Sequence, residues 1–120
     1  IQIIRRGVTS QSIGIKKAIS YYTGMHKIAL DCIAKTSKLS PNAKLAISTL
    51  AYFNFLNSKE RAGIERAVAS GVFAKDKFSK GSKAKLASLI SEQKSYMSNF
   101  EIIASKNNIE FLTNTLKGEA

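Results

Sequence analysis

The chain has 120 residues, of which 44% are hydrophobic, so it suits one folded domain and disorder is not expected. Its 19 Lys and Arg residues against 8 Asp and Glu give a formal net charge of +11, which predicts an anionic partner: nucleic acid, a lipid headgroup surface or a small anion. A single cysteine excludes an internal disulfide, a single histidine provides no metal-binding motif, and no apolar run approaches the roughly 18 residues of a membrane span.

The first predicted element is a long helix over residues 3–35, where apolar residues recur at alternating spacings of three and four. A single proline in the whole chain also favours long helices over strands. Gly7, Gly14 and Gly24 are expected to bend this helix without breaking it. Residues 36–39 are expected to form the turn that follows.

The second predicted helix has the clearest start, with Ser40 as its N-cap and Pro41 at its first helical position. Its apolar face runs through residues 45–56, and the helix is expected to end near residues 71–74.

The third predicted helix starts at Lys80-Gly81-Ser82, after a tight connection in which Phe73 and Phe78 bracket Lys75-Asp76-Lys77 and are expected to pin the connection. Apolar residues share one face up to about Ala104. Asn107-Asn108 is a possible interruption, beyond which residues 109–116 resume the same period.

Three helices of about thirty residues predict an all-α fold, an elongated antiparallel helical bundle. An up-down-up arrangement leaves a groove that a fourth helix would close, supplied by the C-terminal segment, a partner chain or missing sequence. Because the chain starts without Met and already in helical register, residues 1–120 are expected to form a single helical domain, a truncated fragment of a larger protein.

The most informative segment is Lys59-Glu60-Arg61-Ala62-Gly63-Ile64-Glu65-Arg66-Ala67, which places five charges inside the second helix. Asn54, Asn57 and Arg61 fall on the face that carries Leu50, so polar groups interrupt a stripe that should be apolar. Burying an unpaired polar group costs about 2–7 kcal/mol, so a covered face would need polar partners or a ligand. The segment is therefore a candidate anion site.

Two further features of this segment bear on that interpretation. Gly63 costs about 1 kcal/mol relative to alanine in a helix, which suggests the close approach of a neighbouring backbone. In the alternative interpretation, Glu65 pairs with Arg61 four residues earlier and the whole segment is solvated surface.

No set of residues predicts an enzyme, and no cofactor is expected. The eight acidic residues are scattered, which leaves no paired carboxylates for general acid–base catalysis, and no phosphate-binding Gly-rich loop is present. His26 is expected to be a packed or half-exposed helix residue. Nucleic-acid binding is not favoured because the lysines are spread over all three helices. The densest cluster, residues 75–85, could instead contact an anionic membrane or an acidic partner.

Several segments together resemble a known family. These are residues 50–56, the charged segment 59–68, Val72-Phe73-Ala74, Glu92-Gln93 with Tyr96 and Phe100, and upstream Tyr21-Tyr22-Thr23 and Arg5-Arg6. They resemble the nitrate- and nitrite-sensing domain of bacterial chemoreceptors, sensor kinases and related signalling proteins. The resemblance covers about Arg5 to Glu119.

The resemblance implies an all-helical sensory domain that binds nitrate or nitrite and passes a conformational change to an output domain. It also implies the periplasmic or extracellular part of a membrane-anchored bacterial inner-membrane receptor, for example a methyl-accepting chemotaxis protein, and the pairing of two copies as a homodimer. Two other functions stay open: a basic helical module that binds nucleic acid or an anionic membrane, and a ligand-free dimerisation spacer.

The resemblance further implies that arginines on facing helices hold the anion. One corresponds to Arg5 or Arg6 on the first helix, and another is expected beyond the end of this chain. Within the charged segment, Arg61 and Arg66 are further candidate ligands, although for Glu65 and Arg66 a structural network is favoured over direct contact with the ligand. The residues expected to build the structural motif around them are Lys59, Glu60, Gly63 and Glu65.

Overall fold

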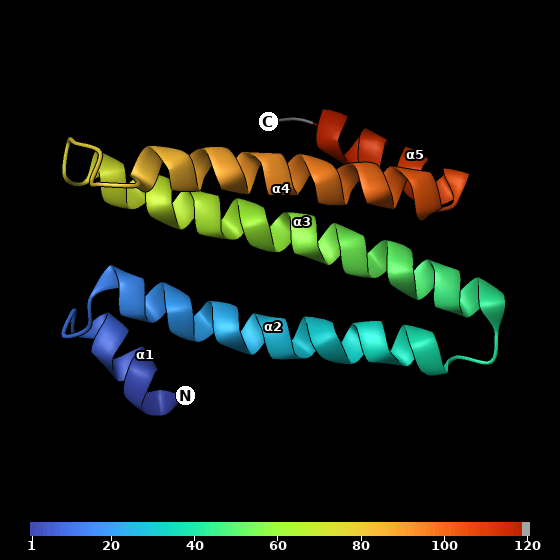
Figure 1. The fold of residues 1–120 in the computed structure, drawn as a ribbon, viewed down its shortest axis with the longest axis horizontal. Helices are drawn as coiled ribbons and strands as arrows, with labels where there is room; N and C mark the ends of the chain where they lie inside the picture. Colours follow the sequence, from blue (N-terminus) through green and yellow to red (C-terminus); the bar gives the residue numbers. More distant parts are fainter. Residues whose placement is uncertain (119–120) are drawn as a thin grey trace.

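The computed structural model describes residues 1–118, which form five α-helices and no β-strand (Figure 1). The helices are α1 (Gln2–Thr9), α2 (Ile15–Leu39), α3 (Ala43–Phe73), α4 (Ser82–Ile103) and α5 (Lys106–Lys117). The predicted all-α, elongated architecture is confirmed, with principal extents of 47 × 32 × 27 Å. Among the described helices, none is long and apolar enough to cross a lipid bilayer.

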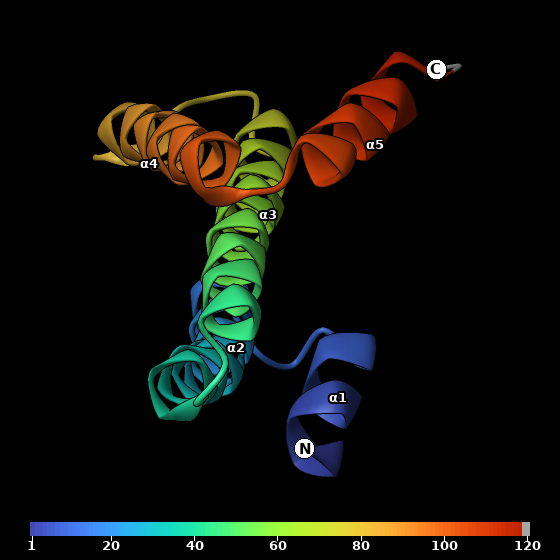
Figure 2. The ribbon, with the colours of Figure 1, turned by 90° about the vertical axis from the view of Figure 1, so that its right-hand side faces the viewer.

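The three long helices α2, α3 and α4 run antiparallel to their neighbours and form a row with α3 in the middle (Figures 1 and 2). α3 packs most extensively against α4 and less extensively against α2. The buried apolar side chains are Ala51 of α3 and Leu89 and Phe100 of α4, and the Phe100 ring lies 5.7 Å from that of Phe55. The best-formed core therefore lies between α3 and α4.

The helix α5 is the segment that resumes after the predicted interruption. It turns back beside the end of α4 and then diverges from it, as Figure 2 shows. α5 does not pack extensively against any other helix, so it does not complete a four-helix bundle.

The prediction of one continuous first helix is wrong. The segment forms two helices, α1 and α2, which are separated by residues 10–14. The hydroxyl groups of Thr9 and Ser10 donate to the carbonyls of Arg5 and Arg6, and the following Gln11 takes a left-handed conformation with φ 54°. Side-chain bonds of this kind compete with helix continuation.

Gly7 permits this break. A Cβ atom at Gly7 would lie 3.0 Å from Ile13 Cγ2, a tight contact that glycine avoids where the chain folds back. Gly7 therefore does more than bend the predicted helix.

The predicted start of the second helix is also shifted. α2 continues through Leu39, so the turn consists of residues 40–42 and not 36–39. The N-cap of α3 is Asn42, whose side-chain oxygen accepts a hydrogen bond of 3.1 Å from the Leu45 N–H, and not Ser40. Pro41 consequently lies before the helix.

The remaining two connections differ in detail from the prediction. The break between α4 and α5 falls before Lys106, because the Ser105 hydroxyl caps α5, and not at Asn107-Asn108. Phe73 and Phe78 do not pin the connection from α3 to α4, since both rings are largely exposed. The Lys83 ammonium lies 5.1 Å from the centroid of the Phe78 ring.

Candidate functional site

The charged segment 59–67 lies midway along α3, the helix that contacts both α2 and α4. Its side chains therefore divide between two interfaces. Those directed toward α4 form a polar network, and those directed toward α2 line a cavity.

An ion pair connects the two helices on the α4 side. Arg61 Nε lies 2.5 Å from Glu92 Oε2, and the Arg61 guanidinium carbon lies 5.8 Å from the centroid of the Tyr96 ring. The Ser88 hydroxyl donates to Glu92 Oε1 at 2.8 Å. This hydrogen bond lowers the pKa of the Glu92 carboxyl. The positive charges of Arg61 and Lys85 lower that pKa further, whereas partial burial of the carboxyl raises it.

A second pair of contacts lies next to this ion pair. The Gln93 amide donates to the Glu65 carboxylate, and the buried Ser58 hydroxyl donates to the Gln93 carbonyl at 3.2 Å. The interpretation in which Glu65 pairs with Arg61 on a solvated surface is therefore wrong, because both side chains bind partners on α4.

The two asparagines of the interrupted stripe are buried, as the face pattern predicts. Asn54 donates to the Leu50 carbonyl and Asn57 to the Phe53 carbonyl, each at 2.9 Å and each within α3. The amide nitrogens of both side chains are thus satisfied within their own helix and need no ligand.

On the α2 side, a cavity of about 610 Å³ lies between α2 and α3, and we call it the central cavity. Its polar side chains come from His26 of α2 and from Lys59, Glu60 and Arg66 of α3, and Gly63 of α3 also lines it. His26 Nδ1 lies 2.6 Å from Glu60 Oε2, which is the closest polar contact between the two helices. The apolar lining consists of Ala29, Leu30, Ile33, Leu56 and Ala62.

The expectation that a backbone approaches Gly63 closely is wrong. A Cβ atom at Gly63 would meet no atom within 4 Å, because the residue is exposed and faces the cavity. The missing side chain instead leaves the cavity wider at this point.

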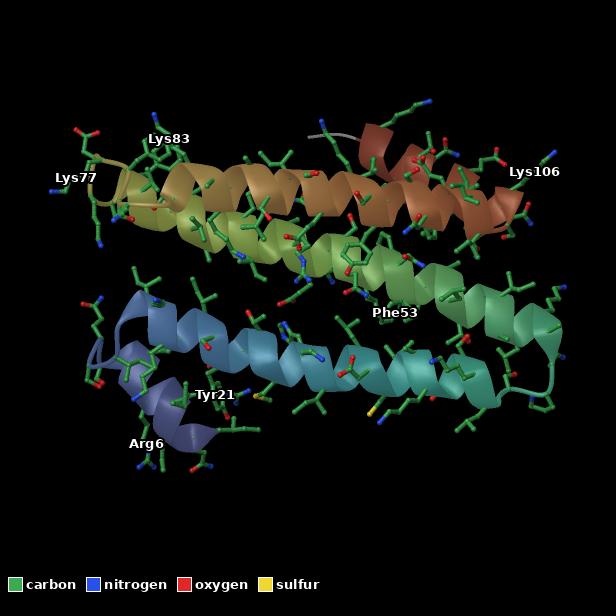
Figure 3. The ribbon with its side chains drawn as sticks, viewed as in Figure 1. Arg6, Tyr21, Phe53, Lys77, Lys83 and Lys106 are labelled. Carbon is green, nitrogen blue, oxygen red and sulfur yellow. The ribbon has the colours of Figure 1, made fainter. Side chains whose placement is uncertain are left out.

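The two N-terminal candidate arginines lie elsewhere. Arg5 and Arg6 are exposed on α1, a short helix that does not pack extensively against another helix. In Figure 3 the Arg6 side chain points away from α2 and α3. The structure thus brings Lys59, Glu60, Gly63 and Arg66 together at one cavity, places Arg61 and Glu65 at the opposite interface, and leaves Arg5 and Arg6 apart from both.

Sequence reasoning missed the partners of the charged segment. For His26 the sequence predicted a packed or half-exposed helix residue without a polar partner, and for Glu92 and Gln93 it indicated no role, yet all three contact the segment directly. These contacts depend on how α2 and α4 are placed lengthwise beside α3, for which a single sequence carries little information.

Comparison with known proteins gives one result. No curated protein and no solved structure matches the chain. A family model described as nitrate and nitrite sensing matches residues 1–120, the whole chain, in agreement with the resemblance carried by the charged segment. The chain therefore belongs to the nitrate and nitrite sensing family.

Proposed function

We propose that this domain is the sensory part of a bacterial signal-transduction receptor of the chemoreceptor or sensor-kinase type. Nitrate or nitrite binding shifts one helix against another, and the parent protein passes this shift to an output domain. We also propose that the domain lies on the periplasmic or extracellular side of a membrane-anchored parent protein and acts as a homodimer. Membership of the sensing family supports the ligand class.

The central cavity is the observation that best supports an anion site. Two basic side chains, Lys59 and Arg66, line it, and its one described carboxylate, Glu60, contacts His26. A guanidinium group presents parallel N–H donors that match the oxygens of a planar oxyanion such as nitrate. An anion bound there would contact both α2 and α3, so binding would favour one placement of the two helices over another.

The proposal gives the other candidate arginines roles outside the central cavity. Arg61 is engaged by Glu92, which supports a structural role in holding α3 against α4. Arg5 and Arg6 are exposed, which leaves them free to contribute to an anion site formed with a partner chain in the homodimer. This second location is the direct alternative to the central cavity.

Titration calorimetry with nitrate, nitrite and chloride tests the assignment. We expect R66Q to weaken nitrate binding by about tenfold, the usual effect of losing one charge-assisted hydrogen bond. The matched control is K106Q, an exposed lysine of α5, which should change affinity by less than about twofold, as for a surface charge.

The results of these titrations distinguish a wrong location of the anion site from a wrong assignment of the function. Loss of nitrate binding in R5Q or R6Q with normal binding in R66Q would move the site to α1 and leave nitrate sensing intact. Absence of nitrate and nitrite binding at millimolar concentration, together with steeply salt-dependent binding of DNA or anionic vesicles, would favour the basic-module alternative.

A further inference from the structure

A second cavity lies between α2, α3 and the start of α4, and we call it the lysine-lined cavity. Its volume is about 770 Å³, within the range of cavities that hold small organic ligands. No residue lines both this cavity and the central cavity, so the two are separate sites.

The lysine-lined cavity combines an apolar wall with positive charge. Ile19 of α2 and Ile64, Val68 and Val72 of α3 provide half-buried aliphatic surface. Five lysines from three segments of the chain also line it: Lys16, Lys27, Lys75, Lys80 and Lys85.

No described carboxylate balances this charge within the cavity, since neither Asp nor Glu is among its lining residues. Of the five lysines, Lys27 alone forms an ion pair within residues 1–118, with Asp31 at 2.9 Å. Charges of one sign gathered around a concave apolar surface raise the local concentration of ions of the opposite sign.

We propose that the lysine-lined cavity binds an amphipathic organic anion, an acidic headgroup on an alkyl chain such as a medium-chain fatty acid. The lysines neutralise the headgroup, and the chain buries its surface against Ile19, Ile64 and Val68. Nitrate alone would leave this aliphatic wall exposed to water. A second copy of the chain is disfavoured as the occupant, because it would bring a further charge of +11 toward five lysines.

Calorimetric titration with decanoate tests the proposal. Decanoate should bind, whereas acetate, which has the headgroup alone, and decyltrimethylammonium, which has the chain with the opposite charge, should not. From hexanoate to decanoate, affinity should rise about fourfold for each added CH₂ group that is buried. Chain-length independence would contradict burial of the chain.

A matched pair of triple variants locates the site. K75Q/K80Q/K85Q removes three lysines of the cavity, and K35Q/K44Q/K106Q removes three exposed lysines that line neither cavity. Both lower the net charge by the same amount, and circular dichroism checks that both retain their helices. The first should weaken decanoate binding by about tenfold and the second by less than about twofold. Equal weakening by both would show non-specific attraction and overturn the proposal.

Two further measurements would identify a different occupant of the lysine-lined cavity. If the cavity triple weakens adsorption to phosphatidylglycerol vesicles and leaves decanoate affinity unchanged, the lysines contact a membrane surface and the proposal fails. If light scattering shows that the cavity triple alters self-association while decanoate affinity stays the same, the cavity is a protein interface, and the proposal fails as well.

Discussion

Arg61 of α3 and Glu92 of α4 form an ion pair between the two most closely packed helices, with Nε 2.5 Å from Oε2. The Nε–H bond is not directed at the oxygen, so within the described residues the buried Nε atom has no hydrogen-bond partner. The side chains are 24% and 38% exposed, so water screens part of the attraction. The charged segment of α3 is thereby fixed to α4 on one side and lines the central cavity on the other.

The first prediction concerns the Glu92 carboxyl. Its pKa lies below the ordinary value of 4.5, chiefly because it accepts the Ser88 hydroxyl. A carboxyl with a lower pKa in the folded than in the unfolded state stabilises the fold when ionised. This contribution is therefore present above about pH 4.5, the pKa of the unfolded chain, and is lost as the pH falls through the lower folded pKa.

The variant S88A should accordingly raise the Glu92 pKa toward its ordinary value. Carboxyl carbon NMR titration of Glu92 measures this directly. The control is S91A, since the Ser91 hydroxyl makes no described contact with Glu92. If Glu92 titrates at the same pH in S88A and S91A, the Ser88 hydroxyl does not set its pKa. We also expect the difference in unfolding free energy between wild type and E92Q to shrink below about pH 4.

The second prediction concerns the core between α3 and α4. Leu89 is the only described side chain of its size that is fully buried, with 0% exposure. L89A should lower the free energy of unfolding by about 2–5 kcal/mol, because it removes buried methyl groups and leaves a cavity. The control is I102A on the same helix, where the side chain is 78% exposed and the loss should stay below about 1 kcal/mol.

Urea denaturation followed by circular dichroism measures both variants. Similar losses in L89A and I102A would mean that the α3–α4 interface is not the main core of the domain.

Much of the fold could be predicted from the sequence, since helical class, helix order and antiparallel arrangement all follow from apolar periodicity in three long segments. The helix ends were less predictable. The break at residues 10–14 brings Ile13 close to Gly7, a local contact across the break that periodicity does not report. The shift from Ser40 to Asn42 depends on which of two capping residues, one on each side of Pro41, the chain uses, and both suit the role.

The candidate site was predictable only in part. The burial of Asn54 and Asn57 followed from the helical face that they share with Arg61. The partners of the charged segment could not be derived, because Glu92 and His26 lie on separate helices whose placement beside α3 is set by packing along the whole interface. A shift of one turn in α2 would move His26 about 5 Å away from Glu60.

The third prediction concerns the start of α3. N42A should lower stability by about 1 kcal/mol, because it removes the hydrogen bond that the Asn42 side chain accepts from the Leu45 N–H. S40A is the matched comparison, since Ser40 hydrogen-bonds only to the Asn42 backbone at 3.2 and 3.4 Å. Thermal unfolding of the two variants should give the larger shift for N42A. A larger shift for S40A would restore the cap indicated by the sequence.

The fourth prediction concerns Gly63, which lies within α3 and faces the central cavity. G63A should stabilise the domain by about 1 kcal/mol, since alanine favours the helix and a Cβ atom would meet nothing within 4 Å. The comparison is G81A, at a residue with φ 82°, where the same change forces a left-handed conformation and should destabilise by about 1–2 kcal/mol.

The same Gly63 variant also probes the cavity. The added methyl group enters the central cavity next to Arg66, so G63A should weaken nitrate binding if the anion lies there, while stability rises. G81A lies outside that cavity and should leave nitrate affinity unchanged at temperatures where the protein stays folded. Denaturation and calorimetry on the same samples measure both quantities. Increased stability with unchanged nitrate affinity in G63A would mean that the glycine is not needed for binding, and would favour an anion site at Arg5 or Arg6.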